Sequence, residues 1–285
     1  MISDNYINGI NVAPIVIEKR LHGVDKKRKK RRVIMKKIFV FIAAALLLMG
    51  GIAAGPAQAA NTPVDLELQL LVDVSGSIDA SEFSLQRTGY VNAFNDAGLY
   101  NNFISKGAIG SIAVELIYWS GASQQQVAVG WSLINSVSSS QAFATLVANA
   151  ARPYSGNTAP GSAINFGAPL FTNAFDGTRQ VMDVSGDGAQ NEGASTTAAR
   201  DAALLAGIDQ INGLVILGEG GLATWYTNNV LGGSGAFLMT ATDFASFENA
   251  IKEKIEIEVI GTPEPLTLLL LGLGLVGVAG LRRKS

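Results

Sequence analysis

The sequence contains no cysteine, and its single histidine, His22, lies in a basic stretch near the N-terminus. The absence of cysteine excludes disulfides, thiolate nucleophiles and cysteine-bound zinc. Without a histidine beyond residue 22, the rest of the chain has no imidazole for a Ser-His-Asp triad, for general-base catalysis or for a zinc site. A metal ion in this part of the chain would be held through oxygen, which suits a hard cation such as Mg²⁺.

Positive charge is also scarce in the middle of the chain. Eleven of the 21 Lys and Arg residues precede residue 38 and three follow residue 281, which leaves seven between residues 60 and 260. The same region contains nineteen Asp and Glu, so its net charge is −12, whereas the whole chain carries −2. An acidic body of this kind repels the phosphates of nucleic acids and attracts cations. Its roughly 200 residues suffice for one domain with a substantial core.

The N-terminal region has the three parts of a secretory signal. Met35-Lys36-Lys37 is followed by an apolar run over residues 38–49 and then by the small-residue triplet Ala57-Gln58-Ala59, which is typical of a cleavage site. We therefore predict a signal peptide over residues 35–60 and interpret residues 1–34 as an extension upstream of the true start. An uncleaved membrane anchor is the alternative interpretation.

The C-terminal region combines Pro263-Glu264-Pro265, an apolar run over residues 266–281 and the basic cluster Arg282-Arg283-Lys284. A helix over the apolar run would span about 24 Å, slightly less than a ~30 Å hydrocarbon core, and the terminal cations favour a cytoplasmic end. This order resembles the PEP-CTERM sorting signal of Gram-negative bacteria. The resemblance implies that an exosortase in the inner membrane recognises and removes residues 262–285. A permanent C-terminal anchor is the alternative.

Between the two signals, apolar runs alternate with amphipathic segments. The pattern predicts strands over residues 66–74, 109–120, 179–185, 211–217 and 236–240, and an antiparallel edge strand over 126–129. It predicts helices over 81–96, with Ser81 as N-cap, and over 141–150, 158–174, 196–206, 223–230 and 243–257. The glycine-rich pieces 218–221 and 232–235 are expected to be loops. Such alternation predicts an α/β fold with a doubly wound, mostly parallel sheet of about six strands and helices on both faces.

Polar side chains follow the first predicted strand. Asp73, Ser75 and Ser77 alternate there, so their side chains point the same way in an extended chain. Open α/β sheets bind ligands at the carboxyl ends of their strands. Two later loops offer further oxygens through Thr158 and Asp187. We predict a metal site in which the three hydroxyls bind the ion directly, while the two carboxylates bind through water or alternate between inner and outer shell.

These five positions, in this chain order, resemble the metal-ion-dependent adhesion site (MIDAS) of the von Willebrand factor A (vWA) domain. The resemblance covers roughly residues 64–259 and implies a Rossmann-like vWA domain over residues 61–261. Shorter segments are similar to an uncharacterised bacterial subfamily, the DUF1194 proteins; they are Val72–Ser77, Gln86-Arg87, Ile117–Gly121, Asp183–Gly188, Ala199–Ala203 and Gly232–Phe237. That similarity implies a fold and a site but no activity.

Several residues near the predicted site are expected to serve local structure instead. An EF-hand loop starting at Asp73 is excluded, because its sixth position is Ile78 rather than Gly and its twelfth is Ser84 rather than Glu. Asp73 could also cap the following helix. Asp79 is expected to begin that helix, and Asp183 to be a hydrogen-bonded core carboxylate.

The remaining candidates are loop and aromatic residues. Asn191 and Glu192 either line the rim of the site or are solvated members of a loop. Packing in the core or against loops is expected for the aromatic residues Trp119, Trp131, Trp225 and Tyr226.

A dication held mainly by neutral hydroxyls stays electrophilic and lacks one ligand. The resemblance to integrin-type A domains implies that a partner protein fills this position with a carboxylate. We therefore expect an exported, non-enzymatic protein-binding or adhesion module with Mg²⁺ (or Mn²⁺ or Ca²⁺), anchored transiently by its C-terminal helix and then located at the cell surface, in the outer envelope or in the extracellular matrix. One alternative is a structural matrix or surface component whose A domain binds no ion. Another is a hydrolase that uses an ion-bound water, although no suitably paired carboxylates lie outside the ion ligands.

Overall fold

The computed structural model describes residues 60–261, together with residues 30, 31 and 35, which are helical. The expected upstream extension, the apolar part of the signal peptide and the C-terminal sorting segment with its helix therefore lie outside the described residues. Among the residues that are described, no helix is both long and apolar enough to cross a membrane.

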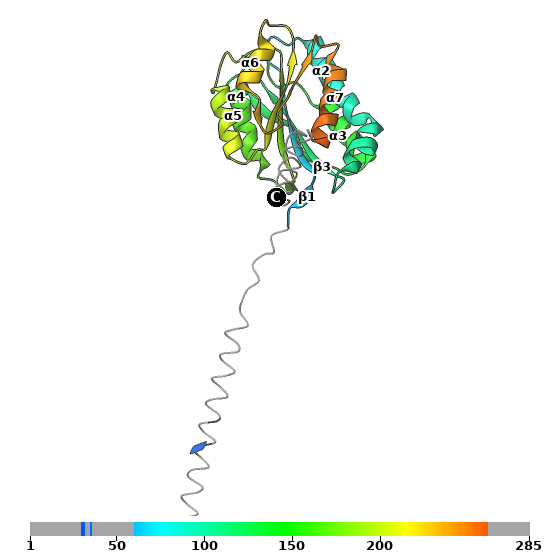
Figure 1. The fold of residues 1–285 in the computed structure, drawn as a ribbon, viewed down its shortest axis with the longest axis vertical. Coiled ribbons are helices and arrows are strands. Elements are labelled where there is room, and N and C mark those ends of the chain that lie inside the picture. The colour runs from blue at the N-terminus through cyan, green and yellow to red at the C-terminus, as the bar shows by residue number, and fades with distance from the viewer. Residues whose placement is uncertain (1–29, 32–34, 36–59, 262–285) are drawn as a thin grey trace, which may run out of the picture. The chain divides into compact units, whose positions relative to one another are not determined.

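The domain is built on a seven-stranded sheet in the order β4-β3-β2-β6-β7-β8, with β9 also pairing with β7 (Figure 1). The parallel strands are β2 (Leu66–Asp73), β3 (Ile112–Trp119), β6 (Gln180–Gly186), β7 (Gln210–Ile216) and β9 (Leu238–Ala241). The antiparallel strands are β4 (Gln125–Ile134) and β8 (Gly232–Gly233). The predicted fold class is confirmed, and the predicted antiparallel strand is present but longer than expected.

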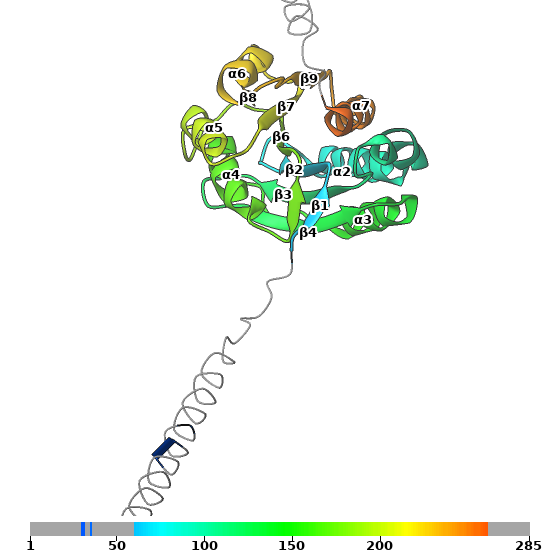
Figure 2. The same ribbon diagram turned by 60° about the horizontal axis from the view of Figure 1, so that its bottom comes forward.

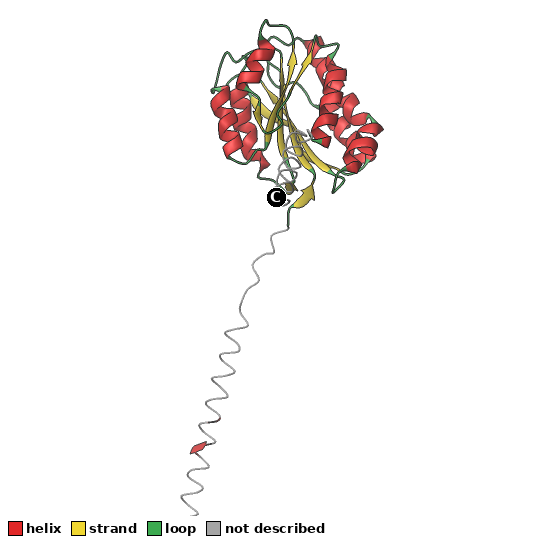
Figure 3. Cartoon of the chain, in the orientation of Figure 1, coloured by secondary structure: helices red, strands yellow, loops and turns green. Residues whose placement is uncertain are grey.

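Helices cover both faces of this sheet, which gives three layers (Figures 2 and 3). One face is covered by α2 (Ala80–Asn95), α3 (Val137–Asn149) and α7 (Phe247–Ile260), and the other by α4 (Pro160–Gly167), α5 (Thr196–Leu205) and α6 (Leu222–Asn229). All eight residues of β2 are buried. Leu70 and Val72 contribute to the hydrophobic cluster under α2, α3 and α7, whereas Leu71 contributes to the cluster under α4, α5 and α6. Alternation along the strand thus serves two cores at once.

Four short elements were not predicted. β1 (Thr62–Val64) and β5 (Phe175–Gly177) form a separate two-stranded parallel sheet, and a π-helical turn (Leu99–Phe103) is followed by a 3-10 turn (Ile104–Lys106). The prediction that residues 232–235 form a loop is wrong for its first half, since Gly232 and Gly233 pair with β7 as strand β8. Segments of this length carry too few residues to show a periodic pattern.

Helix α2 is capped by Asp79, so the prediction of Ser81 as N-cap is wrong. The Asp79 carboxylate accepts hydrogen bonds from the backbone N–H groups of Ser81 and Glu82 at 2.7 and 2.8 Å, and the Glu82 side chain accepts from Asp79 N at 2.7 Å. This reciprocal arrangement is a capping box. It confirms that Asp79 begins the helix, and the alternative that Asp73 caps it is wrong.

The predicted helix over residues 158–174 is shorter than expected. It begins at Pro160, and its α-helical part ends at Gly167, where a 3-10 turn (Ala168–Phe171) takes over. Pro169 lies in that turn and has no N–H to donate to the preceding helical turn, which ends the α-helix. As a result, Thr158 lies in a loop before the helix rather than inside it.

Helix α7 begins at Phe247 rather than at the predicted residue 243. The Asp243 carboxylate accepts a hydrogen bond from Ser246 N at 2.7 Å, and Asp243 N donates to Ser246 Oγ at 3.1 Å. These contacts close a turn before the helix, as is common for Asp and Ser.

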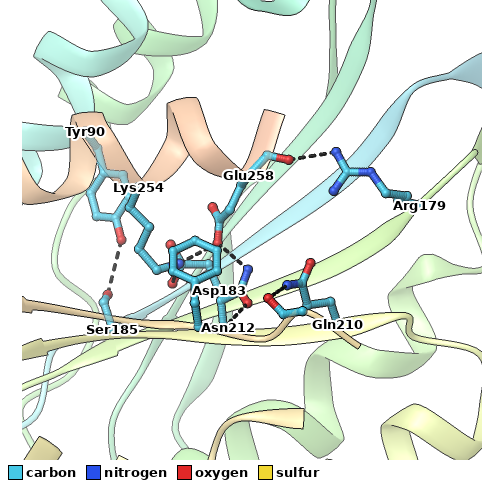
Figure 4. Close-up of polar contacts among 10 residues, drawn as sticks. Tyr90, Arg179, Asp183, Ser185, Gln210, Asn212, Lys254 and Glu258 are labelled. Carbon is cyan, nitrogen blue, oxygen red and sulfur yellow. Dashed lines mark hydrogen bonds and ion pairs between the residues drawn. The ribbon is translucent and has the colours of Figure 1, made fainter. Parts of the chain in front are cut away.

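A buried ion cluster connects α7 to the sheet (Figure 4). We define the Lys254 cluster as Asp183, Lys254 and Glu258, whose side chains come from β6 and α7. The fully buried Lys254 Nζ lies 2.7 Å from Asp183 Oδ1 and also contacts the Glu258 carboxylate. Asn212 Nδ2 of β7 donates to Glu258 Oε1 at 2.9 Å. Asp183 is therefore a core carboxylate, as predicted, and its partner is an ammonium group.

Candidate metal centre

The first two loops of the candidate centre meet because β2 and β6 are neighbours in the sheet. After β2, Ser75 N donates a hydrogen bond to Asp73 Oδ1 at 2.7 Å, and the hydroxyls of Ser75 and Ser77 lie 3.1 Å apart. After β6, the Asp187 carboxylate accepts a hydrogen bond from Ser77 Oγ at 2.7 Å. Four of the five predicted residues are thus joined by direct hydrogen bonds.

The third loop brings Thr158 to the same place. Gly76 N donates to Gly156 O at 2.7 Å, which joins this loop to the one after β2. Gly188 follows Asp187 in the chain. A Cβ atom added to Gly188 would lie 3.7 Å from Thr158 Oγ1. The structure therefore gathers all three predicted segments at the carboxyl ends of β2 and β6.

Asn191 holds the backbone of Thr158 in position. Its side-chain oxygen accepts from Thr158 N at 2.9 Å, and its own N–H donates to Thr158 O at 3.0 Å. The sequence allowed two roles for Asn191, at the rim of the site or as a solvated loop residue. These contacts show that Asn191 supports the loop that carries Thr158.

The two carboxylates of the centre have no cationic partner in the described part of the chain. Asp73 is fully buried, and its Oδ2 has no hydrogen-bond partner there. Burial, and after it the charge of Asp187, raises the pKa of Asp73 to about 8. Burial also raises the pKa of Asp187. None of the ion pairs among the described residues includes either side chain. An uncompensated pair of this kind is costly to ionise.

The charge of Arg152 acts on Asp73, but its hydrogen bonds go elsewhere. Its Nη2 donates to the carbonyls of Val74 and Ser75 at 2.9 and 2.8 Å. The charge of Arg152 lowers the pKa of Asp73 less than burial raises it. Arg152 thus fixes the backbone of the loop after β2 and leaves the carboxylate without an ion pair.

Two residues that sequence reasoning did not assign to the site lie beside Asp73. A Cβ at Gly186 would lie 2.5 Å from the Tyr226 hydroxyl and 2.8 Å from Asp73 Oδ2. Gly186 is therefore needed for the close approach of these groups. Tyr226 packs in the core under α6, as expected, but its buried hydroxyl has no partner among the described residues. Nothing in the sequence around Tyr226 signals this proximity, because α6 is far from β2 along the chain.

The donor set consists of oxygen alone, contributed by three hydroxyls and two carboxylates. Within the described residues no group of three or more His, Cys, Asp and Glu side chains could hold a metal ion, so a metal at this place would depend on the hydroxyls as well. Oxygen donors suit hard cations. The unpartnered Asp73 Oδ2, next to a second carboxylate, fits a cation chemically.

Comparison with known proteins supports this description of the fold. The sequence model of a family described as "Protein of unknown function (DUF1194)" matches residues 63–263, and that of the PEP-CTERM protein-sorting motif matches residues 262–284. No curated protein matches the chain.

Among solved structures, proximal thread matrix protein 1 from the mussel byssus is 14% identical with a TM-score of 0.52, covering 70% of this chain and 50% of that chain. Its form "with zinc occupied MIDAS motif" is 12% identical with a TM-score of 0.50 and the same two coverages. The von Willebrand factor type A protein from Catenulispora acidiphila is 14% identical with a TM-score of 0.50, covering 70% of this chain and 43% of that one. The chain spans about half the length of these proteins or less, and likeness at this level establishes the vWA-like fold alone.

Proposed function

Since the chain belongs to the DUF1194 family, whose description assigns no activity, we propose its function from the geometry of the candidate centre. The protein is a metal-ion-dependent protein-binding module. Ser75, Ser77 and Thr158 bind one Mg²⁺, Mn²⁺ or Ca²⁺ directly, while Asp73 and Asp187 bind it through water or alternate between inner and outer shell.

The observation that carries this proposal is the unpartnered carboxylate oxygen of Asp73. Burying a carboxylate without a counter-charge costs several kcal/mol or forces it to take up a proton. Asp187 adds a second negative charge to the same place. A bound dication supplies the missing positive charge for both groups at once.

Two carboxylates that adjoin the centre in the sequence are unavailable as bases for hydrolysis. Asp79 caps α2 and Asp183 is paired with Lys254, so both are engaged in structural contacts. Neither is placed to act as a base toward an ion-bound water. An ion held mainly by hydroxyls remains electrophilic, and the carboxylate of a partner protein is a suitable further ligand.

The two ends of the described domain lie far from the candidate centre. Near the start of the domain, Thr62 of β1 pairs with Phe175 of β5 as neighbouring strands. At its end, a Cβ atom added to Gly261 would lie 3.2 Å from Arg179 Cζ. Arg179 directly precedes β6, whose opposite end leads to Asp187. Residues 62 and 261 therefore both lie at the edge of the sheet remote from the centre. The PEP-CTERM motif supports export with an exosortase as processing partner and a final location at the cell surface, in the outer envelope or in the extracellular matrix.

Titration calorimetry with Mg²⁺ and Mn²⁺ on residues 60–261, which contain both hydrophobic clusters, tests the metal site. We expect one ion per chain, with binding lost in Asp73→Ala and kept in Asp176→Ala, which changes an exposed residue of β5. Absence of binding, or equal binding by Asp73→Ala, contradicts the proposal. A pull-down with and without chelator then tests the partner. Unchanged stability and partner capture in EDTA would favour a structural component that binds no ion.

A further inference from the structure

Three glutamates surround the candidate metal centre, and we call them the acidic rim. Glu82 lies in the first turn of α2, Glu192 between β6 and α5, and Glu219 between β7 and α6. Each accepts a backbone N–H through its Oε2, from Asp79 at 2.7 Å, Ala122 at 3.2 Å and Ala189 at 3.1 Å, respectively. The rim carboxylates are therefore held in place rather than free to turn away.

The acidic rim lies against the loops that form the centre. Glu219 Oε2 is 4.0 Å from the Cβ position of Gly188, and Glu192 N donates to Thr158 O at 3.3 Å. The charges of Glu82 and Glu219 both act on Asp187. Within the centre, Asp73 Oδ2 is fully buried and unpartnered among the described residues, which is a separate observation that favours a cation at this place.

Two arginines at α2, Arg87 within the helix and Arg152 packed against it, are occupied by other contacts. Arg87 and Arg152 both lie over the ring of Phe83, at 5.4 and 5.8 Å from its centroid. The guanidinium of Arg152 also donates to the carbonyls of the loop after β2. Of the other cations within residues 60–261, four are engaged in contacts elsewhere: Arg179 with carbonyls of α7, Arg200 with Asp201, Lys252 with Asp96, and Lys254 with Asp183 and Glu258.

A partner that offers a carboxylate and nothing else meets opposing forces at this surface. The metal ion attracts it, but the rim carboxylates repel it, and repulsion of this kind acts over a Debye length of about 10 Å. If the partner also carries cationic side chains beside its carboxylate, the rim attracts the partner instead of repelling it, because these cations pair with the rim glutamates. Charge complementarity of this kind selects among partners and speeds association.

We propose that the acidic rim selects a basic partner segment, in which one carboxylate reaches the metal ion and flanking lysine or arginine side chains meet Glu82, Glu192 and Glu219. This inference rests on the proposed metal-dependent binding, and it names the chemical class of the partner.

Fluorescent synthetic peptides test this inference on the full chain, purified in detergent and saturated with Mg²⁺. The first peptide has one central glutamate flanked by lysines, the second has glutamine flanks, and the third has lysine flanks with the central glutamate changed to glutamine. We expect the first to bind about tenfold more tightly than the second at low salt, with the difference largely removed at about 0.5 M salt. The third is expected to lose metal-dependent binding.

The decisive variant combines Glu82→Gln, Glu192→Gln and Glu219→Gln. Glutamine can accept the same backbone hydrogen bonds, and a capping box tolerates it at this position of α2, so folding and Mg²⁺ binding are expected to persist. A matched control removes three exposed negative charges elsewhere through Asp176→Asn, Asp201→Asn and Glu253→Gln. The preference for lysine flanks should disappear in the rim variant and remain in the control.

The outcomes separate this inference from the proposed function. Binding that requires Mg²⁺ and the central glutamate but ignores the flanks overturns the role of the rim and leaves the metal-dependent function intact. An equal preference in the rim variant and in the wild type also overturns the role of the rim. Binding of the lysine peptides that persists in EDTA and without the central glutamate overturns both.

Discussion

Two groups of carboxylates in this domain differ in whether the chain itself supplies a cation. In the Lys254 cluster, Asp183 and Glu258 share an ammonium group that belongs to the chain itself. In the candidate metal centre, Asp73 and Asp187 are accompanied by hydroxyls and have no ion pair among the described residues. Both groups depend on β6, since Asp183 lies within that strand and Asp187 follows its end.

If the proposed metal site is correct, the first group is structural and the second exchanges its cation with the solution. A cation that is covalently part of helix α7 cannot leave, so the Lys254 cluster holds α7 to the sheet whatever the metal-ion concentration of the solution. A centre that depends on a cation from solution can respond to its concentration. Burial of charge is costly in both places, and only a partner of opposite sign offsets it.

The largest expected effect comes from removing the internal cation. Lys254→Met leaves Asp183 and Glu258 buried without a counter-charge, so we expect the free energy of unfolding to fall by about 3–5 kcal/mol. Urea denaturation followed by circular dichroism measures this. The matched control is Lys252→Met, whose partly exposed pair with Asp96 should contribute about 1 kcal/mol or less. Similar losses in the two variants would contradict the structural role of the cluster.

The corresponding change at the metal centre should affect binding instead of folding. Asp73→Asn keeps the shape of the side chain and removes its charge, so we expect the affinity for Mg²⁺ or Mn²⁺ to fall about 10–100-fold. The stability of the metal-free protein should not decrease. Calorimetry and urea denaturation measure the two quantities, with Asp176→Asn as the exposed control. A stability loss as large as that of Lys254→Met would remove the distinction between the two groups.

The pH dependence should also differ between metal-free and metal-bound protein. The pKa of Asp73 is raised from 3.8 to about 8, so the folded chain keeps a proton that the unfolded chain releases. The contribution of Asp73 to the stability of metal-free protein therefore decreases as the pH rises from about 4 to about 8.

Metal binding should expel the same proton, so metal affinity is expected to rise by up to about tenfold per pH unit between pH 6 and 8. Calorimetry at several pH values, repeated in buffers of different ionisation enthalpy, measures the released proton. In Asp73→Asn this dependence should largely vanish; an unchanged slope would assign the proton to another group.

The smallest effect concerns the hydroxyl of Tyr226. Tyr226→Phe removes a buried hydroxyl that has no partner among the described residues, so the metal-free protein should gain about 1 kcal/mol of stability. Thermal unfolding measures the gain, and Tyr100→Phe, a half-buried tyrosine of the π-helical turn, should change little. A clear loss of stability on Tyr226→Phe would mean that the hydroxyl has a partner that stabilises the metal-free fold.

Much of the fold and of the candidate centre could be predicted from local patterns. The run over 66–74 is apolar enough to be a buried strand, and the alternation of Asp73, Ser75 and Ser77 follows from the period of an extended chain. Thr158 was predicted to stand where a loop meets a helix, and it lies in the loop two residues before α4. Local competition between hydrogen bonds was harder to predict, as the cap of α2 shows, since Asp79 and Ser81 are both good N-caps.

Contacts between distant segments were not predictable in the same way. Lys254 and Glu258 have the spacing of an exposed i,i+4 pair on a helix, and only Asp183 beneath them makes the pair a buried cluster. Tyr226 of α6 and Asp73 of β2 likewise approach each other beside Gly186 of β6, so this contact depends on three separate elements.

The sequence by itself determined the order of strands and helices and the five side chains that offer oxygen to the candidate centre, because periodicity and residue chemistry are local properties of the chain. Only the tertiary structure decided which buried carboxylates receive a cation from the protein and which do not. The reason is physical: the cost of a buried charge depends on what lies within a few ångströms of it, and those neighbours come from segments that only folding brings together.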